Sequence, residues 1–300
     1  MKIIFMGTPE FAVPCLEGLI QNGFEVVLAV TQPDKPVGRK QILTPPAVKV
    51  CAEKYGIPVY QPSTLKNGEA EEKLTNIGCD AIVVVAYGKI LPAGILNIPR
   101  LGCINVHASL LPKLRGASPI QWSIVSGEET TGVTTMLMDE GLDTGDILLS
   151  ESLKISSDDT AETLHDRLAP VGAQLLIKTL EGLENGTIKP VKQPEGATFA
   201  PIISKEMGQL DFTKSSTELY NLIRGFYPWP CCYFEHNKRI KVFKATIGGN
   251  TDKNPGEIVV KEGRPFVACG DGRLLELTFI CPSGSKKMTG EEAVRGRIFE

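Results

Sequence analysis

Residues 104–120 read Ile-Asn-Val-His-Ala-Ser-Leu-Leu-Pro-Lys-Leu-Arg-Gly-Ala-Ser-Pro-Ile, which predicts a strand, a loop broken by Pro112 and the start of a helix. On the strand, Asn105 and His107 point to the same face, about 7 Å apart along the chain. Sheets of the α/β class bind ligands outside the carboxyl ends of their strands. The polar pair therefore stands where such a sheet would place a functional site.

The sequence before and after this stretch alternates apolar runs with helix-like segments. We expect strands at 2–6, 26–31, 57–60, 81–86, 102–107 and 132–138, and helices at 10–22, 45–55, 69–76 and 160–184. Alternation of this kind is typical of a doubly wound α/β fold. The first part of the chain is therefore predicted to be a Rossmann-like domain with a parallel sheet.

The periodicity is lost over 190–206, where Gly and Pro are frequent, and short β-like runs between Gly-rich turns follow. Short strands at such spacing indicate a small β-barrel. We therefore expect a catalytic domain over 1–189, a linker over 190–206 and a small barrel over 207–300. Residues 1–206 carry 18 Lys and Arg against 24 Asp and Glu, whereas 207–300 carry 14 against 11. This asymmetry hints that the C-terminal part binds RNA.

A carboxylate in a second loop can join the polar pair. The loop 141–146 reads Gly-Leu-Asp-Thr-Gly-Asp and follows the expected strand at 132–138, so Asp143 can approach His107 from a neighbouring strand. His107 alone would more often be a structural histidine, and Asp143 alone a turn residue. Together with Asn105 they offer an amide, an imidazole and a carboxylate, which suits addition to a carbonyl group. No Ser or Cys stands in a recognisable nucleophile turn.

The composition excludes several other classes. The eight cysteines contain no Cys-x-x-Cys pair and the chain has three histidines, so we expect no metal and a reducing, cytoplasmic location. No apolar stretch reaches the roughly 18 residues of a membrane span. Gly7 and Pro9 interrupt the N-terminal apolar run, so no signal peptide is expected.

These motifs carry a family resemblance. Asn-x-His at 105–107, Ser-Leu-Leu-Pro-x-x-Arg-Gly-x-x-Pro at 109–119 and Gly-Leu-Asp-Thr-Gly-Asp at 141–146 resemble the signature of the enzymes that transfer formyl from 10-formyltetrahydrofolate. Further matches to the branch that acts on charged initiator tRNA lie at 1–12, 32–40, 83–92 and 224–230. One departure is Leu114, where an aromatic residue is common in the family.

The resemblance implies an activity and its site. It implies formyl transfer from the co-substrate 10-formyltetrahydrofolate to the α-amino group of methionyl initiator tRNA, with Asn105, His107 and Asp143 as catalytic residues. It also implies that the folate contacts Ser109, Leu110, Leu111 and Pro112, and that the C-terminal barrel is OB-like. A monomeric enzyme is expected.

Two loops complete the predicted site. The loop 87–92 follows a buried strand, so the backbone of Lys89, Ile90 and Leu91 can pair with a flat pterin and two of these side chains can wall it. The loop 34–44 is too long and too basic for a minimal βα connection. We expect Arg39 and Lys40 in it to contact tRNA phosphates.

Three other functions remain open from the sequence. A folate-dependent formyltransferase on the same scaffold could act on a small amine, such as a sugar nucleotide or glycinamide ribonucleotide; the basic loop and the extra barrel disfavour it. An RNA-binding protein without catalysis is disfavoured by the intact polar set. A nicotinamide oxidoreductase is disfavoured because the first strand–helix turn, 6–11, has one glycine and no Gly-x-Gly-x-x-Gly.

Overall fold

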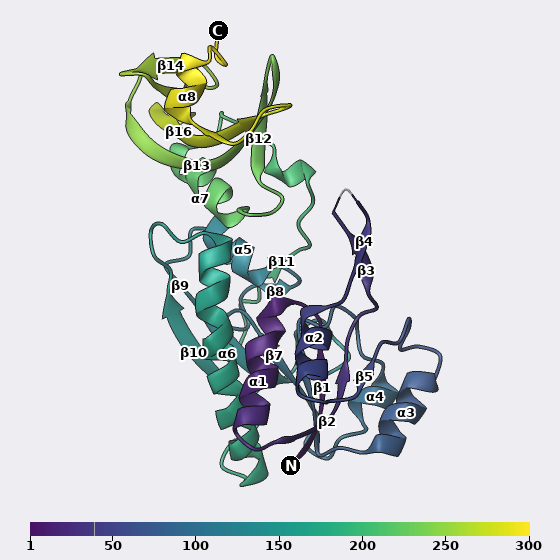
Figure 1. The fold of residues 1–300 in the computed structure, drawn as a ribbon. Helices are drawn as coiled ribbons and strands as arrows, with labels where there is room; N and C mark the ends of the chain where they lie inside the picture. The colour runs from purple at the N-terminus through teal and green to yellow at the C-terminus, as the bar shows by residue number, and fades with distance from the viewer. Residues whose placement is uncertain (39) are drawn as a thin grey trace. The chain divides into compact units, whose positions relative to one another are not determined.

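The computed structural model describes residues 1–38 and 40–300 (Figure 1). The chain forms two compact units, each built from more than one stretch of sequence. The first comprises Met1–Pro119, Thr131–Lys154 and His165–Ala200, and the second comprises Ile120–Thr130, Ile155–Leu164 and Pro201–Glu300. The predicted division into a catalytic domain over 1–189, a linker over 190–206 and a C-terminal domain over 207–300 stays a prediction.

The first unit is built on a seven-stranded sheet in the order β10-β9-β7-β6-β1-β2-β5. Its strands are β1 (Lys2–Gly7), β2 (Glu25–Val30), β5 (Val59–Tyr60), β6 (Ala81–Val85), β7 (Cys103–His107), β9 (Thr130–Leu137) and β10 (Ile147–Lys154). The five neighbouring strands β5, β2, β1, β6 and β7 pair in parallel, whereas β7 and β9 are antiparallel. The Rossmann-like prediction is confirmed, with the correction that the sheet is mixed rather than wholly parallel. The expected strands agree with those observed to within about two residues at each end, apart from this reversal.

Helices cover both faces of this sheet. They are η1 (Glu10–Ala12), α1 (Val13–Gln21), α2 (Ala47–Lys54), α3 (Glu69–Ile77), α4 (Ala93–Leu96) and the long α6 (Ala161–Glu184). On one face, Gly172 of α6 lies against Val106 and Val133, and α1 packs on α6 where Gly18 meets Ala173. On the other face, α3 and α4 bury an apolar cluster against the opposite side of the same strands. Because side chains alternate along a strand, Asn105 and His107 belong to the α4 face.

Two small β-pairs of the first unit were not expected from the sequence. The loop 34–44 folds back as a hairpin of β3 (Lys35–Val37) and β4 (Ile42–Thr44). Farther along, β8 (Arg115–Gly116) pairs in parallel with β11 (Phe199–Ala200). The β11 strand falls inside the segment predicted as a linker.

The second unit is built on an antiparallel sheet in the order β12-β13-β16-β15-β14, with β17 paired to β16. The strands are β12 (Cys232–His236), β13 (Lys238–Asn250), β14 (Ile258–Lys261), β15 (Arg264–Ala268), β16 (Arg273–Pro282) and β17 (Met288–Thr289). The helical elements are α5 (Pro119–Val125), η2 (Glu206–Gly208), α7 (Ser216–Gly225) and α8 (Gly290–Arg295). The short strands expected in this part of the chain are confirmed; closure into an OB-like barrel stays a prediction.

Within the second unit, α7 packs against the sheet. Its Leu219 and Ile223 are buried with Ile240 and Val242 of β13. Both α7 and α8 start with capping boxes, in which a Ser or Thr and the acidic residue three positions later satisfy free backbone N–H groups. None of the helices in the described part of the chain has the length and hydropathy needed to span a bilayer.

Candidate active site

The carboxyl end of β7 presents two polar side chains to the α4 face of the sheet. His107 is buried and Asn105 is half-buried. Cys103 precedes them on the same face, with its Sγ 3.8 Å from the carbonyl oxygen of Ile95 in α4. Burial raises the pKa of the Cys103 thiol to about 12, so it stays protonated at neutral pH and is a poor nucleophile. The amide of Asn105 and the imidazole of His107 are therefore the candidate functional groups at this strand end.

Asp143 reaches this pair from the loop between β9 and β10. Its carboxylate accepts a hydrogen bond from the backbone N–H of Gly116 at 2.7 Å. The other carboxylate oxygen lies 3.5 Å from Nδ2 of Asn105, and the first lies 3.7 Å from Nδ1 of His107. The structure thus brings together the three residues expected from the sequence.

The backbone of the Asp143 loop explains its glycines. Asp143 has φ 53°, in the left-handed region that residues other than glycine rarely adopt. Gly145 packs so closely on the carbonyl oxygen of Leu137 that a Cβ at this position would overlap it. The loop can turn back over the sheet and present Asp143 only with glycine at 145.

The orientation of the His107 ring is fixed by a loop carbonyl. Its Nε2 lies 3.0 Å from the carbonyl oxygen of Leu114. A carbonyl only accepts, so Nε2 carries a proton. Nδ1 is then the ring atom that faces Asp143, either as a base in the neutral ring or as a second donor in the imidazolium. Donation from His107 to a substrate oxygen must therefore come from Nδ1.

The segment 109–112, expected to contact the folate, forms the loop that follows His107. Ser109 is fully buried, and its hydroxyl donates to the carbonyl of Lys113 at 2.6 Å. Its carbonyl accepts from the hydroxyl of Thr134 at 2.7 Å, and the same hydroxyl accepts from the backbone N–H of Leu111 at 3.2 Å. Leu110 and Pro112 are half-buried, and Leu111 is buried. The hydroxyl of Ser109 is thus used inside the protein, and these hydrogen bonds hold the loop beside His107.

The loop 87–92 is anchored by its lysine. Nζ of Lys89 donates to the carbonyls of Pro62 and Ser63, each at 2.8 Å. Partial burial, and then the charge of Lys35, lower the pKa of Lys89. Ile90 is 71% exposed, whereas Leu91 belongs to the buried cluster beneath α4. Only one of the two expected apolar walls therefore faces outward.

Of the two residues expected to contact tRNA, Lys40 lies in the turn between β3 and β4. Lys40 is exposed. Arg39 lies outside the described residues. The β3–β4 hairpin exposes Val37, Ile42 and Leu43 by 56%, 62% and 65% of their surface.

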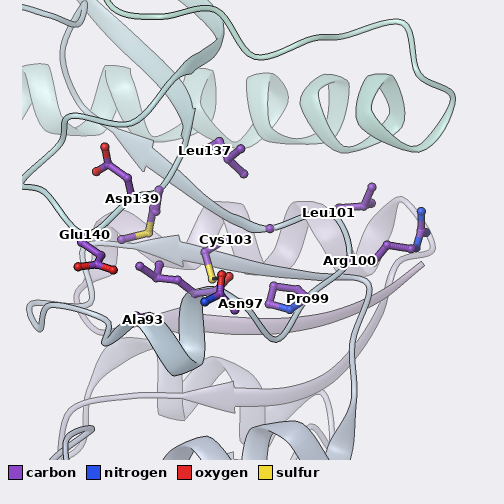
Figure 2. A pocket seen from close by; sticks show the side chains of 12 residues that line it. Ala93, Asn97, Pro99, Arg100, Leu101, Cys103, Leu137, Asp139 and Glu140 are labelled. Atoms are coloured by element: carbon purple, nitrogen blue, oxygen red, sulfur yellow. Dashed lines mark hydrogen bonds between the residues drawn. The ribbon is translucent and has the colours of Figure 1, made fainter.

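A pocket of about 500 Å³ opens on the α4 face of the sheet. One of its lining residues is Cys103, which precedes Asn105 by two positions on β7. Figure 2 shows Asp139 and Glu140 at one end of it and Arg100 and Leu101 at the other, with Cys103 between them. Leu96, Leu137 and Met138 also line it. None of the residues expected to contact the folate lines this pocket. Leu91 lies two positions before α4, and residues of α4 do line it.

Sequence reasoning missed the groups that hold this site together. They are the carbonyl of Leu114, the N–H of Gly116, the hydroxyl of Thr134 and the amide of Gln193, which bonds to the backbone of Asp143 and Gly145. Backbone groups leave no signal in a sequence. The Thr at 134 and the Gln at 193 carry no motif by themselves.

Among the described residues, no group of three or more His, Cys, Asp or Glu side chains is arranged to hold a metal ion. All eight cysteines are free. The donor set at the strand end, with an amide, an imidazole and a carboxylate, suits acyl-type transfer through direct attack on a carbonyl.

The fold and this donor set define a formyl transferase. The formyl transferase family model matches residues 1–180, and the formyl transferase C-terminal domain model matches 202–297. The methionyl-tRNA formyltransferase of Thermodesulfovibrio yellowstonii is 47% identical over 98% of this chain and 96% of its own length. That of Acidobacterium capsulatum is 49% identical over 99% of this chain and 96% of its own. The chain belongs to the methionyl-tRNA formyltransferase family.

Solved structures share the fold at lower identity. An N-formyltransferase from Helicobacter canadensis, in complex with folinic acid and dTDP-3-aminofucose, superposes with a TM-score of 0.71 at 23% identity, covering 96% of this chain and all of that one. HypX from Aquifex aeolicus, in complex with tetrahydrofolic acid, gives 0.66 at 16% identity, covering 98% of this chain and 47% of that one.

Proposed function

We propose that this enzyme transfers the formyl group of 10-formyltetrahydrofolate to the α-amino group of methionyl initiator tRNA, giving N-formylmethionyl-tRNA for translation initiation. The observation that carries the proposal is the convergence of Asn105, His107 and Asp143 in a chain whose relatives at 47% and 49% identity are methionyl-tRNA formyltransferases. We propose that it acts as a monomer in the cytoplasm.

The three side chains support a direct transfer. The amine attacks the formyl carbon, negative charge develops on the formyl oxygen, and the bond from carbon to N10 of the folate then breaks. Nδ2 of Asn105 has two N–H groups, and only one of them points to Asp143, at 3.5 Å. The second can donate to the formyl oxygen as its charge grows, which is the type of contact that stabilises such transition states most.

The proton that leaves the amine has a base within the same cluster. The neutral His107 ring, with Nε2–H bound to Leu114, offers its Nδ1 lone pair, and Asp143 at 3.7 Å stabilises the imidazolium that results. The imidazolium can then return a proton to N10 of the departing folate. Asp143 acts in this proposal as the charge partner of His107.

For the folate, the loops 87–92 and 109–112 remain the proposed contacts. The pocket between α4 and Leu137–Glu140 adds a place for the pterin, because it has apolar walls and lies on the same face as Asn105. The chain segment that lines this pocket at Met138 continues directly into the loop that carries Asp143. A pterin seated there would place its formyl-bearing arm toward the catalytic cluster.

For the tRNA, Arg39 and Lys40 remain the proposed phosphate contacts. The exposed apolar side chains of the hairpin support the proposal, because a lone two-stranded hairpin gains little stability from exposing them and they are suited to contact a partner.

The test is a formyl-transfer assay with 10-formyltetrahydrofolate and charged initiator methionyl-tRNA. Elongator methionyl-tRNA, free methionine and a dTDP-linked amino sugar serve as the competing acceptors. We expect transfer to the initiator tRNA alone to be efficient. Preferred transfer to the amino sugar would favour the small-amine function instead.

A further inference from the structure

The segment 191–200 runs across both loops of the active site. Val191 exchanges two backbone hydrogen bonds with Ile147, at 2.8 and 2.9 Å. Farther on, Thr198 accepts from the N–H of Leu114 through its hydroxyl and from the N–H of Arg115 through its carbonyl, both at 2.9 Å. The segment therefore forms a strap, defined here as residues 191–200, that ties the Asp143 loop to the 114–118 loop.

Gln193 is the side chain in this strap that touches both loops. Its Nε2 donates to the carbonyls of Asp143 and Gly145, each at 2.8 Å. Its Oε1 accepts from Nε and Nη2 of Arg115, at 3.1 and 2.7 Å. Both amide protons and the oxygen are thus used, which fixes the orientation of the amide.

The Asp143 backbone needs such external support. A φ of 53° is unfavourable for an aspartate, and such a conformation persists only where surrounding contacts impose it. Gln193 bonds to the carbonyl of Asp143 itself, and Gly116, the partner of the Asp143 carboxylate, follows Arg115 directly. One amide therefore sets the positions of the carboxylate and of its N–H donor together.

We propose that Gln193 is a positioning residue for formyl transfer: it holds the Asp143 carboxylate on Gly116 and facing His107. The inference rests on the proposed function for its effect on rate, but its geometric content can be measured without substrate. Gln193 does not touch the reacting atoms, so its loss should lower kcat and leave the KM for the folate nearly unchanged.

Two near-isosteric variants test the two halves of the Gln193 contact. One half is donation by Nε2 to Asp143 and Gly145, and the other is acceptance by Oε1 from Arg115. Gln193→Glu keeps an oxygen for Arg115 but turns a carboxylate oxygen toward the carbonyls of Asp143 and Gly145. Gln193→Met removes both halves. We expect both variants to lower kcat, by about 10- to 100-fold, because small displacements of catalytic groups have effects of that size. Asn22→Asp is the matched control, since Asn22 donates to the carbonyl of Gly18 at the end of α1, which supplies nothing to the site.

The second readout is the backbone amide of Gly116 in ¹⁵N-labelled protein. Its proton should move upfield and exchange faster in both Gln193 variants, while the amide of Lys2, bonded to Asp80 at 2.8 Å, stays unchanged and shows that the fold is intact. An unchanged Gly116 amide would overturn the proposal, as would a Gln193→Glu variant with wild-type kcat. A wild-type enzyme inactive on methionyl-tRNA would refute the proposed function, while the Gly116 amide would still decide the role of Gln193.

Discussion

At the scale of single residues, Asp143 combines a charge with a geometric role. Its carboxylate accepts from Gly116 and faces His107. Asp143→Asn keeps an oxygen for Gly116 and removes the negative charge, so it separates the two roles. If the charge stabilises the imidazolium, kcat should fall by about 100-fold or more with little change in thermal stability. Steady-state kinetics and thermal unfolding check this; wild-type kcat in the variant would show that Asp143 is needed only for its geometry.

Tyr87 carries a buried hydroxyl that has no hydrogen-bond partner among the described residues. Its side chain is 2% exposed, and burial raises the pKa of its phenol to about 12. A buried polar group without a partner costs about 1–3 kcal/mol, so Tyr87→Phe should leave the free energy of unfolding unchanged or raise it by about 1 kcal/mol. Urea unfolding measures this. A variant destabilised by more than about 1 kcal/mol would mean that the hydroxyl has a partner in solution.

At the scale of elements, the β3–β4 hairpin carries the basic turn proposed to hold the tRNA. Lys40→Ala should raise the KM for charged tRNA and reduce the salt dependence of binding by about one phosphate contact, because each such contact releases counterions. The KM for the folate should not change. Lys178→Ala is the control, since Lys178 is exposed on α6, on the other face of the sheet. Equal effects of the two substitutions would argue against a specific contact at the hairpin.

The elements that could be predicted from the sequence are those with enough length to show a period. The buried strand Ala81–Val85 and the amphipathic helix Ala161–Glu184 are examples. The strands β8 and β11 have two residues each, which is too short to show the alternation of a strand. The strap also shows no helical or strand periodicity, so its Pro and Gly residues indicated only a linker. The meeting of Asn105, His107 and Asp143 followed from strand alternation and loop position, whereas the Leu114 carbonyl that orients His107 depends on a loop path that no motif encodes.

At the scale of the whole molecule, the second unit includes two stretches from within residues 1–189, the part predicted to be the catalytic domain. Arg224 of α7 donates to the carbonyls of Ser156 and Asp159, and Gly225 lies against Val125. A chain ending near residue 206 would leave Val125 and its neighbours without these partners. Substitution of basic residues such as Lys241 and Lys244 therefore tests tRNA binding by this unit better than truncation near residue 206 does.

Buried thiols predict how the stability of the molecule depends on pH. Burial raises the pKa of Cys15, Cys103 and Cys269 from 9.0 to about 12 each. Above pH 9 the unfolded chain releases these protons and the folded chain does not, so the free energy of unfolding should fall as the pH rises toward 12. Urea unfolding at several alkaline pH values checks this. Cys15→Ala should flatten the decline relative to the wild type. An unchanged slope in this variant would contradict the explanation.

In the proposed function, Asn105, His107 and Asp143 together perform formyl transfer to methionyl-tRNA. The most direct test is the single-turnover rate of transfer from 10-formyltetrahydrofolate to charged initiator tRNA, measured for the wild type and for Asn105→Ala, His107→Ala and Asp143→Ala, each checked for native folding. We predict transfer by the wild type and a loss of about 10²- to 10³-fold in each variant. A folded His107→Ala variant that keeps most of the wild-type rate would contradict it.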